Sequence, residues 1–159
     1  MSGLQETLAS VLADRYSTNA ARVRELAAPL TNEQFWQKPF PYGNSFGHLV
    51  LHLTGNLNYY IGSQIARTGY VRDRPREFTD PNPPSKEEAL QRFDESVAMV
   101  KQTVRAQSAD NWSSEYSAVG TNAKNRLDMI MQCAAHIQHH IGQMIYLGYQ
   151  WQQARTSPK

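Results

Sequence analysis

Residues 132–147 read QCAAHIQHHIGQMIYL and contain three of the chain's five histidines, His136, His139 and His140. The apolar residues of this stretch recur every three or four positions, which predicts one long helix. His136 and His140 are four residues apart, so they lie on the same helical face, about 40° from each other. Two imidazoles at that spacing can hold one divalent ion between them.

The other two histidines, His48 and His52, lie together in an earlier apolar segment, FGHLVLHLTGNL, at residues 46–57. This segment also has helical spacing, and its two histidines are again four residues apart. We therefore expect two helices to meet and to build a histidine-rich metal site between them.

Apolar residues at helical spacing predict four long helices in the chain. The expected helices cover residues 4–26, 46–67, a segment that follows the capping-box pattern at 85–88, and 123–152. Ser45 is the expected N-cap of the second helix, and Thr121 or Asn122 is the expected N-cap of the fourth. Because no segment alternates as a strand does, the pattern indicates an all-α, single-domain four-helix bundle that spans residues 1–159.

Residues 71–85 form the longest segment without periodic apolar residues, and they include Pro75, Pro81, Pro83 and Pro84. A connection of this length is unusual between adjacent antiparallel helices, which commonly take short links. We expect a long crossover that passes over one end of the bundle and lets the second and third helices run parallel.

Length and composition exclude several classes of protein. A chain of 159 residues can bury a sizeable core without a disulfide or a structural metal. The net charge of +2 comes with scattered basic residues, so we expect no nucleic-acid partner. The single cysteine, Cys133, excludes an intrachain disulfide framework and suits a reducing compartment. Because neither a signal-peptide pattern nor a membrane-length apolar run is present, we expect a soluble, cytoplasmic protein with no membrane partner.

The five histidines differ in how they face the apolar stripes of the expected helices. His140 falls at the edge of the stripe of the last helix, His136 can reach the same flank, and His139 points towards the polar side. His52 faces inward on the second helix, whereas His48 lies near its start. The preferred ligand set is therefore His52, His136 and His140. The alternative is that each inward histidine merely has a polar hydrogen-bond partner.

Three neutral imidazole nitrogens suit zinc, nickel, copper or ferrous iron. Three protein ligands also leave coordination positions open, as in catalytic rather than structural sites. A ligating histidine normally donates its other N–H to an acceptor, and Asn56, Gln132 and Gln143 are the candidates. The alternative for these three is that they are ordinary polar residues at a helix edge. Cys133 could close the site as a fourth ligand, but a small buried residue is the preferred interpretation.

The charged residues give weaker signals. Ile137 stands where a zinc peptidase of the H-E-x-x-H type has its glutamate base, which excludes that class. A carboxylate base would have to come from elsewhere in the fold, because none is adjacent to the histidines in the sequence. A group of arginines could bind an acidic substrate, but a solvated loop with Asp73 and Glu77 as counter-charges is preferred. This group comprises Arg67, Arg72, Arg74 and Arg76.

The run SFGHLVLHL at residues 45–53 and the run HIQHHIGQ at residues 136–143 resemble the DinB/YfiT-like family of bacterial proteins. The resemblance implies a four-helix bundle with a crossover between its second and third helices, frequently assembled as a homodimer. It also implies a divalent metal, often zinc or nickel, held by His52, His136 and His140. Characterised members of the family include metal-dependent transferases and isomerases that use low-molecular-weight thiols.

On this basis we expect a metal-dependent enzyme that acts on a small molecule, with a thiol-dependent S-transferase as the leading interpretation. No residue is assigned a catalytic role. A metal-dependent hydrolase and a non-catalytic helical binding or stress-response protein are the alternatives. The roles of His48 and His139 stay open, and metal sensing or storage through them would require more than one ion per chain.

Overall fold

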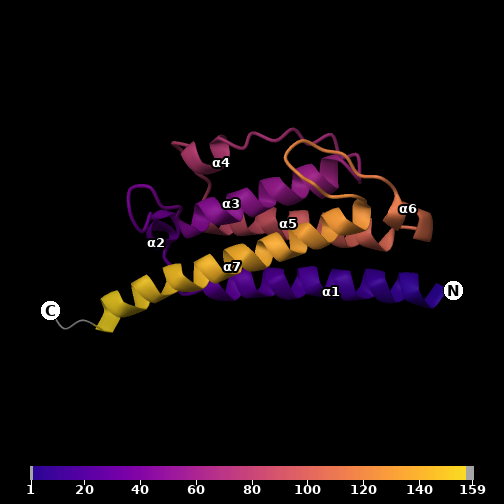
Figure 1. Ribbon diagram of the computed structural model, residues 1–159. Coiled ribbons are helices and arrows are strands. Elements are labelled where there is room, and N and C mark those ends of the chain that lie inside the picture. Colours follow the sequence, from indigo (N-terminus) through magenta and orange to yellow (C-terminus); the bar gives the residue numbers. More distant parts are fainter. Residues whose placement is uncertain (1, 157–159) are drawn as a thin grey trace.

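The computed structural model describes the backbone of residues 2–156 and the side chains of residues 3–151. Four long helical segments run side by side, and three short helices lie in the connections (Figure 1). The long segments are α1 (Ser2–Ala27), α3 (Phe46–Leu57) with its π-helical continuation η1 (Asn58–Ser63), α5 (Lys86–Arg105) and α7 (Arg126–Thr156). The short helices are α2 (Asn32–Trp36), α4 (Arg76–Thr79) and α6 (Ala109–Ser113). No strand forms within residues 2–156, so the expected all-α bundle is confirmed.

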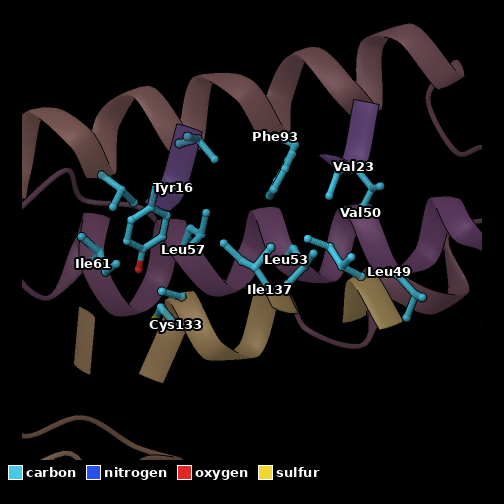
Figure 2. Close-up of a cluster of buried hydrophobic side chains, with 14 of the residues drawn as sticks. Tyr16, Val23, Leu49, Val50, Leu53, Leu57, Ile61, Phe93, Cys133 and Ile137 are labelled. Atoms are coloured by element: carbon cyan, nitrogen blue, oxygen red, sulfur yellow. The ribbon is translucent and has the colours of Figure 1, made fainter. Parts of the chain in front are cut away.

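The core forms where the apolar stripes of the long segments meet (Figure 2). α1 and α3 each pack against α5 and α7. Leu53, Phe93 and Ile137 come from three different helices and are fully buried. Each such side chain removed from water stabilises the fold by about 1.5–3 kcal/mol. Tyr16 is buried among them, and its hydroxyl donates to the backbone oxygen of Ile130, 2.7 Å away, so its polar atom has a partner.

Serine hydroxyls set the starts of α3 and α5. Ser45 Oγ accepts a hydrogen bond from the amide of His48 at 3.1 Å, and Ser85 Oγ accepts one from the amide of Glu88 at 3.2 Å. Each bond satisfies an amide that a helix leaves without an internal partner at its N-terminus. Both serines are therefore N-caps, as the sequence predicts.

The predicted start of the last helix is wrong. α7 begins at Arg126, about one turn later than expected. Asn125 Oδ1 accepts a hydrogen bond from the amide of Asp128 at 2.9 Å and so takes the capping role assigned to Thr121 or Asn122. Several polar residues precede the first apolar residue of the stripe, and helical spacing alone does not select the one that caps the helix.

The second long helix changes geometry near its end. α3 is α-helical as far as Leu57, and the chain then continues as the π turn η1. It leaves the helix through Arg67 and Gly69, which have positive φ angles of 58° and 77°. The helix expected over residues 46–67 is therefore α-helical only as far as Leu57, and its π-helical continuation ends at Ser63. Two tyrosines of the π turn line a cavity described below, and π turns of this kind occur frequently at functional sites.

The connection over residues 64–85 runs back along α3 and carries α4 (Figure 1). α3 and α5 both begin beside α2, where the amide of Lys86 donates to Asn32 Oδ1 at 2.8 Å. The two helices therefore run parallel, which confirms the long crossover. Its route differs from the expectation, because the segment follows the length of α3 instead of passing over one end of the bundle. None of the described helices is long and apolar enough to span a membrane.

Candidate metal centre

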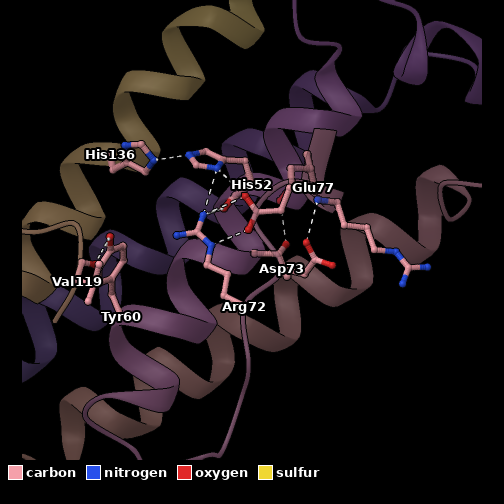
Figure 3. Close-up of polar contacts among 10 residues, drawn as sticks. His52, Tyr60, Arg72, Asp73, Glu77, Val119 and His136 are labelled. Atoms are coloured by element: carbon pink, nitrogen blue, oxygen red, sulfur yellow. Dashed lines mark hydrogen bonds and ion pairs between the residues drawn. The ribbon is translucent and has the colours of Figure 1, made fainter. Parts of the chain in front are cut away.

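Three histidine side chains from two helices converge between α3 and α7. His52 is buried on α3, whereas His136 is half-buried and His140 buried on successive turns of α7. One ring nitrogen from each histidine lies within 4.8 Å of the other two. His52 Nε2 and His136 Nε2 are 3.0 Å apart (Figure 3). The structure thus brings together the three residues that the sequence singles out, and metal binding by them stays a prediction.

A carboxylate fixes the tautomer of His52. Nδ1 of this ring lies 2.8 Å from Glu77 Oε2 (Figure 3). Because a carboxylate oxygen only accepts hydrogen bonds, Nδ1 must carry the ring proton. Arg72 Nη2 lies 3.3 Å from the same Nδ1 but cannot bond to it, since both nitrogens are then donors. In the neutral ring the lone pair is then on Nε2, which faces Nε2 of His136 at 3.0 Å.

Arg72 holds Glu77 in place. Its Nε and Nη2 donate to Oε1 and Oε2 of Glu77 at 2.7 Å and 3.0 Å. The two side chains are only 10% and 7% exposed, so they form a buried, bidentate ion pair. The solvated-loop interpretation is therefore wrong for Arg72 and Glu77, although Arg67, Arg74 and Arg76 are exposed as it requires. Charge spacing in a loop does not reveal which side chains fold back onto a helix.

A glutamine fixes the tautomer of His140. Gln143 Oε1 lies 2.7 Å from His140 Nδ1 and accepts its hydrogen bond, while Gln143 Nε2 faces the exposed His139 at 3.5 Å. Nε2 of His140 is buried and has no hydrogen-bond partner in the described part of the chain. A buried nitrogen in this state costs free energy. A cation between the three rings would satisfy it.

The surroundings keep the two inward imidazoles of α7 neutral. Burial, followed by the neighbouring rings of His140 and His52, lowers the pKa of His136 to about 4. Burial also lowers the pKa of His140 to about 4, although its hydrogen bond with Gln143 acts in the opposite direction. Both rings are therefore neutral at pH 7, which is the form that binds metals.

The remaining histidines and the cysteine have other places in the fold. His48 Nδ1 accepts a hydrogen bond from the amide of Ser45 at 3.2 Å, so this side chain completes the N-terminal cap of α3. His139 is exposed on α7, as predicted. Cys133 is buried in the core, and burial raises the pKa of its thiol to about 12, so the thiol stays protonated and unreactive.

An open cavity of about 1190 Å³ adjoins His52 and His136 and is large enough to admit a small molecule. Two of the three residues predicted to accept a histidine N–H, Asn56 and Gln132, lie in its wall. Gln132 donates instead to Asp128 Oδ1 at 3.0 Å. Aromatic and basic side chains from η1 and the crossover complete this part of the wall, namely Tyr59, Tyr60, Tyr70, Arg72 and Arg74.

The three histidines fit a divalent transition metal. Zinc binds imidazole nitrogen at about 2.0–2.1 Å, so two ligands at the tetrahedral angle lie roughly 3.3 Å apart. The 3.0 Å between the nitrogens of His52 and His136 is close to that separation. The other separations are at most 4.8 Å. Three protein ligands would leave at least one coordination position of the ion open.

Sequence reasoning missed Arg72 and Glu77 as parts of this site. They follow His52 by 20 and 25 residues, in a segment without periodicity, so spacing does not connect them to α3. One local signal was present in the sequence. Gly55 stands inside the helix three residues after His52, where glycine is unfavourable and leaves room for a side chain from elsewhere.

Comparisons with known proteins place the chain in a family. Residues 15–144 match the family model of the DinB superfamily, while no curated protein matches the sequence. A conserved protein from Enterococcus faecalis has a similar structure, with a TM-score of 0.71 and 17% identity, over 87% of this chain and 94% of that one. A DinB-like protein from Bacillus cereus superimposes with a TM-score of 0.65 and 15% identity, over 87% and 89% of the two chains. The two structures share the fold, and the family model covers most of the sequence: the chain belongs to the DinB superfamily.

Proposed function

We propose that the protein is a metal-dependent enzyme in which His52, His136 and His140 hold one divalent cation. The observation that carries this proposal is the buried Nε2 of His140, which lacks a partner among the described residues and lies beside two other imidazoles. Zinc and nickel are the preferred ions, with iron and copper as the next candidates. A cation at this position would satisfy all three rings at once.

The proposed reaction is the transfer of a low-molecular-weight thiol to a small electrophilic substrate. A divalent cation, when bound, supplies Lewis acidity that lowers the pKa of a thiol. The cavity beside His52 and His136 offers room for the thiol and its acceptor. Its tyrosines and arginines would orient them, and Arg72 already lies 6.0 Å above the ring of Tyr60.

The position of Glu77 favours a thiol transferase over a hydrolase. A hydrolase commonly uses a carboxylate as the general base for water. Glu77 is the carboxylate nearest to His52 among those with described contacts, but it bonds to Nδ1, on the opposite side of the ring from Nε2. It therefore cannot accept a proton from a group in the cavity. A thiol needs less assistance, because its own pKa is closer to neutrality.

Metal content tests the first part of the proposal. Protein purified without a histidine tag is loaded with zinc, desalted and analysed by mass spectrometry, together with His136→Ala and His140→Ala. His139→Ala is the matched control, because this exposed histidine lies on the same helix and outside the cluster. We expect one ion per chain in the wild type and the control and none in the other two variants. Equal metal content in all four proteins would contradict the proposal.

Thiol consumption tests the second part. The wild type and His136→Ala are incubated with cysteine or glutathione and a model electrophile such as chlorodinitrobenzene, with and without zinc or nickel. We expect metal-dependent loss of the free thiol with the wild type only. A rate that is unchanged by the metal or by the variant would exclude the thiol transferase.

The homodimer and the cytoplasmic location expected from the sequence stay predictions. Exposed Phe40 and Tyr146 line a mainly apolar groove beside the C-terminal half of α7, which supports a contact between two copies. Analytical ultracentrifugation tests the dimer, and fractionation of the source cells tests the location.

A further inference from the structure

Gly55 leaves a space on α3 that the crossover fills. A Cβ atom at this position would lie 2.1 Å from Oε1 and 2.9 Å from Cδ of Glu77. No side chain other than hydrogen fits at position 55 while Glu77 keeps its place. Glycine is, after proline, the least favourable residue in a helix interior. Gly55 therefore destabilises α3 at the position where the carboxylate approaches.

The carboxylate that fills this space is held at both oxygens. Oε2 accepts from His52 Nδ1 at 2.8 Å, and Arg72 donates to both oxygens at 2.7 Å and 3.0 Å (Figure 3). A buried carboxylate needs such partners to offset the loss of its hydration. The pair therefore has one defined position, and in that position it faces the ring of His52.

A second side chain of the crossover contacts the same ring. Phe78, the residue after Glu77 on α4, lies with its ring centroid 5.3 Å from that of His52 at an interplanar angle of 37°. Glu77 and Phe78, neighbours on the crossover, therefore both contact the His52 ring. α7, by contrast, approaches the Nε2 edge through His136.

We infer that the crossover is a functional part of the metal centre: Glu77 is a positioning residue that sets the tautomer and direction of His52, and Gly55 admits it. The inference rests on the proposed function, because its purpose is to present Nε2 of His52 to the cation. Carboxylates that orient metal-binding histidines typically change metal affinity by about 10–100-fold when they are removed. Movement of the crossover away from α3 would therefore weaken metal binding.

Two variants test the inference without removing a ligand. Gly55→Ala displaces the carboxylate but keeps its chemistry. The double variant Arg72→Met/Glu77→Met removes both charges together, so that neither is left buried alone, and replacement of a buried ion pair by apolar side chains is often tolerated. Circular dichroism and thermal unfolding establish that each metal-free variant is folded.

Two control variants match these changes. Gly47→Ala also introduces a clash on α3, since its Cβ would lie 2.5 Å from the Trp36 ring, but it does not reach Glu77. Asp80→Asn removes another ion pair of the crossover, that with Arg76 at 3.1 Å, which lies away from His52. Neither control should alter the binding of zinc.

The first readout is the tautomer of His52 in the metal-free protein, measured by nitrogen-15 NMR of the imidazole rings. We expect the Nδ1–H form in the wild type and in both controls, and a mixture of tautomers in the two test variants. A purely structural role for Glu77 would leave the tautomer unchanged. The same tautomer in every protein would overturn the inference.

The second readout is zinc affinity, measured by competition with a chromophoric chelator. We expect the test variants to bind zinc 10–100-fold more weakly than the wild type, and the controls to bind it equally well. Equal affinity in the test variants would overturn the inference and leave the proposed function standing. Absence of zinc binding by the wild type would instead overturn the proposed function, and the inference with it.

Discussion

His52 on α3 and His140 on α7 are oriented by different kinds of partner. The partner of His140 is Gln143, three residues further along the same helix, whereas the partner of His52 is Glu77, which comes from the crossover 25 residues later. The first contact follows from helical geometry, and the second requires tertiary structure. One half of the site therefore forms with its helix, and the other half forms only when the crossover has packed against α3.

The largest effect is expected when the contact across the crossover is broken. Glu77→Ala leaves the guanidinium of Arg72 buried without its partner, and we expect the free energy of unfolding to fall by about 3–5 kcal/mol. Gln143→Ala removes a part-buried contact between successive turns of α7 and should cost only about 1 kcal/mol. Urea denaturation of the metal-free proteins measures both values. Similar losses in the two variants would contradict the distinction between the two halves.

A smaller effect is expected on metal binding when the local contact between Gln143 and His140 is removed. Gln143→Ala frees the ring of His140 to rotate, and we expect a loss in zinc affinity of about tenfold, at the lower end of the usual range, because the amide is neutral. Chelator competition measures it beside Arg72→Met/Glu77→Met, which should lose more. Gln150→Ala, an exposed residue further along α7, is the control. If Gln143→Ala lost more affinity than the double variant, the proposed ranking of the two supports would be reversed.

The smallest effect is expected on the free energy of unfolding when one glycine on each of the two helices is replaced by alanine. Gly142 on α7 is exposed, and a Cβ at this position meets no described atom within 4 Å. We therefore expect Gly142→Ala to raise the free energy of unfolding by about 0.5–1 kcal/mol, through helix propensity alone. Gly55→Ala should lower it, because its Cβ overlaps Glu77. Thermal unfolding of the two variants tests this difference in sign, and a gain in both would show that the space at Gly55 is not needed.

Local patterns were sufficient to predict most of the fold. Ser45 and Ser85 cap helices through bonds to amides three residues later, so their effect is visible in a short stretch of sequence. The apolar stripes predicted the four long helices for the same reason. The convergence of the three histidines also follows from helical spacing, once the two helices are taken to pack together and the family resemblance is considered.

The parts that were not predicted depend on contacts between distant residues. Three features differ from the prediction. Asn125 caps α7, a π turn follows α3, and the crossover packs along α3. The prediction that Arg72 and Glu77 are solvated was wrong, because a proline-rich segment has no periodicity that indicates where it packs. Their burial becomes visible only when Gly55 and Glu77 are seen to occupy adjoining space.

The most direct test of the metal centre is a crystal structure of zinc-loaded protein with anomalous diffraction recorded on both sides of the zinc absorption edge. The proposed metal centre predicts one anomalous peak between α3 and α7, at about 2.0–2.1 Å from a ring nitrogen of each of His52, His136 and His140. A peak at another place, or a cation held by only one of the two helices, would contradict it.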